Sequence, residues 1–406
     1  MSASPSFAKL FWLFLKIGAT SFGGNIVLVA AIRDQVVKKN NWLPEDTLMD
    51  ATTLGSVLPG PLATNVTAFI GYRLRGLAGA LVCLGAVLIP AFILLCVLSW
   101  LYFQFGEQQT MEQIFRGIIP GVVAVILATA IDMGKKTVKQ WEQAVIVALA
   151  AAAMIFFAGF LTTLGVMAVS GLAGFILFRK EQHAPPGEIK NSRALFREVG
   201  WFVGILATVT AVFFTVGYFV SPEVRAELQL LARLTGTFGG MSVTLFGGGY
   251  VFVPAISTVV VDANHWVTAK EFADGIAMGQ VTPGPIMISA AFIGWKVSGF
   301  WGAFVSTVAI FLPPAFVMVI ASHFTERIRG NAAVEAVFKG MRPAVIGMIL
   351  AAVVYFIKTI SPAWPADWPL FLIFAVILGL ALFVKKLDSA LLIPISGLLG
   401  WLLYLI

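Results

Sequence analysis

The sequence predicts an all-α polytopic membrane protein that contains two copies of one helical unit in inverted topology. Three observations predict this fold class: the composition, a long internal duplication and a series of apolar runs of helix length. Of the 406 residues, 59% are hydrophobic and only 12% are charged, and the mean hydropathy is +0.93. A water-soluble core of this composition would have too little polar surface to cover it, so the chain is expected in a lipid bilayer.

The duplication is visible by direct comparison. Thr20–Trp42 returns as Thr244–Trp266, and both segments continue into a Pro-Gly-Pro triplet. At an offset of 224, residues 20–61 and 244–285 agree at eighteen of forty-two positions. The offset then becomes 223, and the match continues as far as Gly340. A duplication inside an apolar chain is typical of membrane transporters.

The apolar runs predict thirteen spans, because about twenty helical residues cross roughly 30 Å of hydrocarbon. These are 7–31, 48–71, 77–103, 113–133, 143–159, 161–178, 199–220, 229–259, 271–294, 299–321, 333–357, 369–384 and 389–406. The pieces 143–159 and 161–178 are short, and they either cross or form a tilted hairpin. Both alternatives leave the number of crossings odd.

The spans divide the chain into an N-terminal repeat (1–180), a linker with one connecting helix (181–227) and a C-terminal repeat (228–406). Six spans and one connecting span precede the second copy, so it is expected to enter the membrane from the opposite side. Two inverted repeats related by a pseudo-two-fold axis in the membrane plane can expose a central site to each face in turn.

The distribution of basic residues predicts the orientation. With the N-terminus inside, sixteen Lys and Arg residues fall in inner loops and seven in outer loops, which favours a cytoplasmic N-terminus and an outside C-terminus. The net charge of +7 could indicate nucleic-acid binding, but the basic residues stand in short clusters between apolar runs. We therefore interpret the charge as topology and expect a lipid bilayer, not nucleic acid, as the partner.

Glycine and proline motifs predict the substrate site. They weaken or interrupt helices inside the spans, and unsatisfied backbone at membrane depth is tolerated only beside protein or a wet cavity. A restarted helix presents free N–H groups and a partial positive charge, which attract anions. The candidate substrate-binding residues are Ser21, Gly23, Gly24, Asn25, Pro59, Gly60, Pro61, Thr64, Asn65, Gly247, Gly248, Gly249, Gln280, Thr282, Pro283, Gly284, Pro285 and Ser289. Their hydroxyls, amides and backbone suit a tetrahedral oxyanion. The alternative is that the glycines only permit close helix packing and the prolines only kink.

The paired FGG and PGP elements, the duplicated N-x-W after the first helix and the layout of six, one and six spans resemble the chromate ion transporter family in its long two-domain form. The resemblance covers essentially the whole chain. It implies export of chromate through the bacterial inner membrane and chromate resistance, with sulfate as a chemical relative. The first copy has SFGGN where the second has LFGGG, which leaves open which half dominates binding and which dianion is carried.

Three cations are candidates for attracting the anion. Arg116 and Lys339 occupy equivalent positions near the starts of their helices, where a cation opposes the helix dipole. They either draw the anion into alternate vestibules or extend to lipid phosphates. Arg342 has no cationic counterpart in the first copy, so it is the better candidate for direct substrate contact in one half.

Three acids are candidates for proton coupling. Asp50 and Asp274 each lie nine residues before their PGP, a helical rise of about 13.5 Å, which predicts a capping or boundary role near a membrane surface. Asp132 could pair with Lys135 or Lys136. Coupling is not required energetically, because a dianion leaving a cell at 100 mV, negative inside, gains about 4.6 kcal/mol. That energy sustains a gradient of more than three decades, at about 1.4 kcal/mol per tenfold.

Other function classes find little support. The sequence has no nucleotide-binding glycine motif, no H-E-x-x-H and no closely spaced Cys or His set, so we expect no enzyme activity, cofactor or metal. A membrane scaffold subunit for an enzyme and an oxyanion channel remain as alternatives. Small-residue faces at Gly76-x-x-Gly79 and Gly171-x-x-Gly174 leave a homodimer open.

Overall fold

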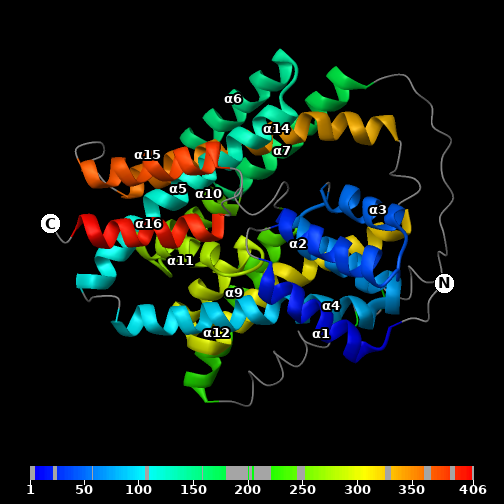
Figure 1. Ribbon diagram of the computed structural model, residues 1–406, viewed down its shortest axis with the longest axis horizontal. Coiled ribbons are helices and arrows are strands. Elements are labelled where there is room, and N and C mark those ends of the chain that lie inside the picture. Colours follow the sequence, from blue (N-terminus) through cyan, green and yellow to red (C-terminus); the bar gives the residue numbers. More distant parts are fainter. Residues whose placement is uncertain are drawn as a thin grey trace.

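The structure is a computed structural model that describes residues 5–21, 25–56, 58–105, 109–157, 159–179, 221–244, 252–324, 331–360, 367–384 and 389–404, together with residues 200 and 204. Within these ranges every regular element is a helix, which confirms the all-α prediction (Figure 1). The first part of the chain forms α1 (Phe7–Thr20), α2 (Asn25–Ile32), the π-helix η1 (Arg33–Lys39), α3 (Glu45–Gly55), α4 (Leu62–Phe105), α5 (Gln109–Thr137), α6 (Trp141–Phe156) and α7 (Phe160–Phe178). The second part forms α9 (Pro222–Ser242), α10 (Phe252–Ser257), the π-helix η2 (Thr258–Ala263), α11 (Ala269–Val281), the 3₁₀ helix η3 (Ile286–Ser289), α12 (Ala290–Ala321), the 3₁₀ helix η4 (Ser322–Phe324), α14 (Ala332–Ile360), α15 (Trp368–Phe383) and α16 (Ser389–Leu403).

The helices confirm a polytopic membrane protein. Within the described residues, five stretches are long and apolar enough to cross a bilayer: Leu62–Phe105, Glu112–Thr137, Leu161–Phe178, Ile286–Phe324 and Ala332–Lys358. Three shorter apolar helices accompany them, in Trp141–Phe156, Trp368–Phe383 and Leu391–Leu403. On α7, the side chains of Leu161, Val169 and Ile176 are 79%, 69% and 69% exposed. Such an apolar outer surface is suited to contact with lipid chains.

Four predicted spans are divided in the structure. The run 7–31 forms α1 and α2, and the run 229–259 contains α9 and α10. The runs 48–71 and 271–294 are divided at the PGP triplets, the first between α3 and α4 and the second between α11 and η3. The connecting span predicted at 199–220 lies outside the described residues except for Gly200 and Gly204, as does most of the linker. The number of crossings between the copies is therefore untested, and the inversion stays a prediction.

Each copy contains a tight helical hairpin. Within α4 the helix is broken at Arg75 (φ −145°, ψ 25°) and Gly76 (φ +64°), and the chain folds back so that Gly71 and Gly79 meet backbone to backbone. A straight helix would hold these two glycines about 12 Å apart. Within α12 the same break occurs at Ser298 and Gly299 (φ +53°). Only glycine adopts a positive φ without steric cost, so the sequence fixes both turns.

The duplicated sequence produces duplicated local geometry. The π-helices η1 and η2 fall at matching places, and each is followed by a residue in the left-handed region, Asn41 (φ 50°) and His265 (φ 51°). The central glycines of the PGP triplets, Gly60 and Gly284, have φ of 93° and 120°. Both copies therefore fold alike at the level of single backbone angles.

The two copies pack so that helices of each copy lie against helices of the other. In the first copy α5 packs against α15 and α16, and in the second α14 packs against α6 and α7 (Figure 1). The long hairpin helices α4 and α12 pack together, with α1 against α4 and α9 against α12. One packed group therefore combines α1–α4 with α9 and α12, and the other combines α5–α7 with α14–α16. In the second copy α10 contacts α7 and α14, and α11 contacts helices of both groups. The pairing of α1 with α4 corresponds to that of α9 with α12, and the pairing of α5 with α15 and α16 corresponds to that of α14 with α6 and α7.

The small-residue faces considered for a homodimer are used inside the chain. Gly174 lies against the backbone of Gly340, and Gly171 faces Met341, so the face on α7 is covered by α14. Gly79 is covered by Gly71 in its own hairpin. The face at 171–174 therefore gives no support to the homodimer that the sequence left open, because its small residues allow two helices of one chain to approach closely.

Replacing Gly174 with Val tests this contact. A Cβ at this position would lie 2.6 Å from the backbone nitrogen of Gly340, so the helices must separate. We expect Gly174→Val to lower the free energy of unfolding by about 1–3 kcal/mol, as overpacking does, seen as a lower melting temperature in detergent. Gly165→Val is the matched control on the same helix, because a Cβ there meets no atom within 4 Å. Equal melting temperatures for the two variants would contradict the assignment.

Candidate functional site

Part of the predicted site lies outside the described residues. Gly23 and Gly24 in the first copy, and Gly247, Gly248 and Gly249 in the second, belong to this group. Asn25 begins α2, but its side chain is not among the described ones. The described site therefore consists of the two PGP breaks and Ser21, the residue that follows α1.

The first break separates α3 from α4, and polar side chains close it. Asn65 donates from Nδ2 to the carbonyl of Pro59 at 2.8 Å, and Thr64 donates from Oγ1 to the carbonyl of Pro61 at 3.0 Å. Both side chains are fully buried. The other amide atom of Asn65, Oδ1, has no hydrogen-bond partner among the described residues. The break thus leaves a buried polar atom available to a ligand or water.

The second break separates α11 from η3 and α12, and a threonine before the triplet, not after it, makes the side-chain hydrogen bond. Thr282 donates from Oγ1 to the carbonyl of Gly279 at 2.9 Å. Ser289, which is equivalent to Asn65, is buried, and its Oγ has no partner in the described part of the chain. Gln280 is also buried, close before the triplet. In each copy the residue at this equivalent position lies beside a glycine of the preceding helix, Asn65 beside Gly55 of α3 and Ser289 beside Gly279 of α11.

A backbone hydrogen bond joins the two copies at this site. The N–H of Gly284, inside the second triplet, donates to the carbonyl of Ser21 at 3.2 Å. Ser21 is 1% exposed, and its hydroxyl has no partner among the residues described. The end of α1 in one copy and the broken helix of the other are therefore in direct contact.

The two PGP breaks also pack against the paired helices α4 and α12. A Cβ on Gly60 would overlap the ring of Pro314 in α12, and a Cβ on Gly284 would lie 3.5 Å from Ala91 in α4. Pro314 and Ala91 occupy equivalent positions in the two copies. Each triplet is thus held against the long helix of the other copy, and the glycine at its centre permits the close approach.

Two of the three predicted cations are found in ion pairs at some distance along the chain from the breaks. Arg116 bonds Glu112 at 3.2 Å, and Lys339 bonds the equivalent Glu335 at 3.1 Å. These glutamates, one turn earlier, explain how a cation is accommodated near a helix start. Arg342 is exposed on α14. Their role in attracting the anion stays a prediction.

The predicted acids differ sharply in burial. Asp132 is exposed and bonds Lys136 at 2.6 Å, which confirms the pairing expected for it. Asp50 is half-buried on α3. Asp274 is 0% exposed, because α4, α5, α14 and α16 also cover α11. It does not cap this helix, whose N-cap is Thr268. Its place near a membrane surface stays a prediction.

Sequence reasoning missed the partner of Asp274. Tyr102, at the end of α4, donates from its hydroxyl to Asp274 Oδ2 at 2.7 Å. The tyrosine ring makes edge contacts with Phe103, Phe115 and Phe292. The second carboxylate oxygen, Oδ1, has no partner among the described residues. A tyrosine in an otherwise apolar run was the available signal, because a buried phenol needs a hydrogen-bond partner.

Duplicated units, paired helix breaks and a bilayer-length helical fold define a multi-pass membrane transporter. The chain belongs to the chromate transporter family, whose model matches residues 8–175 and 232–401. This confirms the resemblance noted from the FGG and PGP motifs.

Three relatives match nearly end to end. A protein of Methanocaldococcus jannaschii, named as an uncharacterized transporter, is 28% identical over 98% of this chain and 95% of its own length. A probable chromate transport protein of Synechococcus elongatus is 29% identical over 97% and 95%. A chromate transport protein of Cupriavidus metallidurans is 26% identical over 98% and 93%. No solved structure matches the chain.

Replacing Tyr102 with Phe tests the pair with Asp274. The change removes the hydroxyl and leaves a buried carboxylate without this donor, which should cost about 1–3 kcal/mol of unfolding free energy. The double variant Tyr102→Phe with Asp274→Leu should recover most of the loss, since both polar partners are then gone. Melting temperatures in detergent report the effect. Asp132→Asn, at an exposed pair, is the control and should change little. A Tyr102→Phe variant as stable as the parent would show that the hydrogen bond to Asp274 does not stabilise the fold.

Proposed function

We propose that the chain is a secondary transporter that exports chromate from the bacterial cytoplasm by alternating access, with its N-terminus inside and its C-terminus outside the inner membrane. Membership of the chromate transporter family and the names of two relatives support the substrate. The observation that carries the mechanism is the Gly284–Ser21 hydrogen bond, which joins the broken helix of one copy to the other copy beside buried polar atoms.

The chemistry of the two breaks supports an oxyanion substrate. The hydroxyls of Ser21 and Ser289 are buried donors without partners among the described residues, so each can donate to an oxygen of a tetrahedral dianion. The restarted helices after Pro61 and Pro285 add free N–H groups and the positive end of the helix dipole. Thr64 and Thr282 already donate to carbonyls of the breaks, so they shape the site.

The membrane potential is a sufficient driving force. Moving two negative charges out through 100 mV releases about 4.6 kcal/mol, so uniport alone can hold cytoplasmic chromate about a thousandfold below the outside concentration. If protons are coupled, Asp274 is the best placed of the three candidate acids. It is fully buried, whereas Asp132 is exposed and Asp50 is half-buried. It also touches both copies through Tyr102.

Chromate flux in proteoliposomes containing only this polypeptide tests the proposal. With the potential clamped and the pH gradient varied independently, we expect saturable flux that follows the potential, together with counterflow and competition by sulfate. Flux that follows the pH gradient would establish proton coupling. Flux that does not saturate and shows no counterflow would indicate a channel. Absence of flux would support a scaffold role and overturn the proposal.

Replacing Ser289 with Ala tests the substrate site. Loss of one hydrogen bond to a charged group costs about 1.5–3 kcal/mol, so the apparent KM for chromate should rise by roughly tenfold to a hundredfold. Ser99→Ala is the matched control, because Ser99 is equally buried without a partner in the described structure but lies on α4, far along the chain from either triplet. The site assignment fails if the two variants transport chromate with the same KM.

A further inference from the structure

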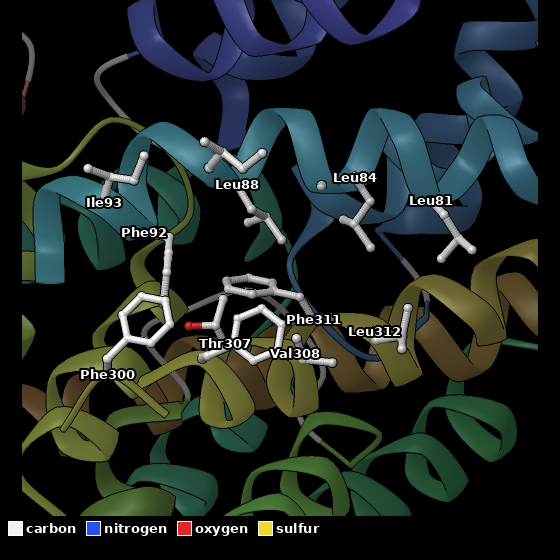
Figure 2. Close-up of a pocket in the computed structure, with 13 residues that line it drawn as sticks. Leu81, Leu84, Leu88, Phe92, Ile93, Phe300, Thr307, Val308, Phe311 and Leu312 are labelled. Atoms are coloured by element: carbon white, nitrogen blue, oxygen red, sulfur yellow. The ribbon is translucent and has the colours of Figure 1, made fainter. Parts of the chain in front are cut away.

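An apolar groove lies between the long helices α4 and α12 (Figure 2). Its volume is about 450 Å³. In Figure 2, Leu84 and Leu88 extend from α4 towards Phe311 and Thr307 on α12. Leu81, Ile93 and Phe304, at its edges, are 47%, 56% and 45% exposed, so the groove opens to the outside of the molecule. It is separate from the polar site at the helix breaks.

The two copies contribute equally to this groove. Five lining positions of α4 correspond, at the offset of 223, to five lining positions of α12. The pairs are Leu81 with Phe304, Leu84 with Thr307, Gly85 with Val308, Leu88 with Phe311 and Ile89 with Leu312. The groove therefore follows the relation between the copies, and it exists because equivalent helices face each other there.

The lining offers a ligand nothing but apolar contact. Thr307 is the only residue in the lining with a polar side chain, and its hydroxyl donates to the carbonyl of Ala303 at 2.8 Å. A polar solute would lose its hydrogen bonds to water on entering and gain none. Apolar cavities of this kind stay dry and accept apolar ligands. The occupant must be a hydrocarbon.

We propose that the groove binds one acyl chain of a membrane phospholipid. Both helices are long and apolar enough to span the bilayer, so the groove opens onto hydrocarbon that lipid chains supply. At roughly 30 Å³ for a group the size of water or a methylene, the volume holds about fifteen such groups in line, the size of one lipid tail. Three turns of a helix about 10 Å across would need roughly 1,300 Å³, so a helix of a second copy does not fit inside.

The acyl chain would lie directly behind the substrate site. Ile89 is two residues before Ala91, which faces Gly284, and Leu312 is two residues before Pro314, which faces Gly60. The bound chain would thus fill the space between the two helices that support both triplets.

Photolabelling of the full chain in vesicles tests the proposal. The probe is phosphatidylglycerol with a diazirine near the end of one acyl chain, and labelled peptides are mapped by mass spectrometry. Gly85→Leu fills the groove without a clash, because a Cβ at Gly85 meets no atom within 4 Å. We expect it to reduce labelling of residues 300–312 at least fivefold, while labelling of α7 is unchanged. Val308→Trp fills the groove from the equivalent position in the other copy and should act alike.

Gly165→Leu is the matched control, since Gly165 is exposed on α7 and a Cβ there also meets no atom within 4 Å. It should leave labelling of 300–312 at the parent level. Equal labelling in the parent and both filled variants would overturn the proposal. A change from dimer to monomer in the filled variants, measured by light scattering, would overturn it as well, because the groove would then seat a second copy.

Discussion

A helix can be broken inside a bilayer only when other groups satisfy the backbone donors and acceptors that the break releases. This constraint organises the centre of the molecule. Asn65 and Thr64 donate to carbonyls of the first triplet, and Thr282 donates to the carbonyl of Gly279 before the second. The amide of Gly284 donates to Ser21 of the other copy. Neighbouring side chains therefore satisfy backbone groups at the first break, and the opposite copy does so at the second.

The exchange of helices determines what can move. Neither sequence copy is a compact unit, because α5 packs with α15 and α16 while α14 packs with α6 and α7. The packing instead groups α1–α4 with α9 and α12, and α5–α7 with α14–α16. Helix α11, which precedes the second triplet, contacts helices of both groups. Relative motion of the two groups would therefore change the packing around α11.

The sequence predicts much of this architecture because duplication and apolar length are strong signals. Most span boundaries agree with the observed helices, and Asp132 pairs with a lysine as expected. Contacts between distant segments were not predicted. Burial of Asp274 depends on Tyr102, which is 172 residues earlier in the chain. The glycine face of α7 is covered by α14, and no local pattern indicates which helix will use a small-residue face.

The copies share a backbone but differ in the side chains at the breaks. When the two copies are aligned, Asn65 corresponds to Ser289, and half-buried Asp50 corresponds to fully buried Asp274. If the two copies were identical in sequence and inverted in the membrane, the inward-open and outward-open states would have equal free energy. Because the side chains at the breaks differ, the two states differ in free energy. A difference of about 1.4 kcal/mol already populates one state tenfold over the other. The empty carrier should therefore rest facing one side of the membrane, and the same asymmetry would make its forward and reverse cycles run at unequal rates.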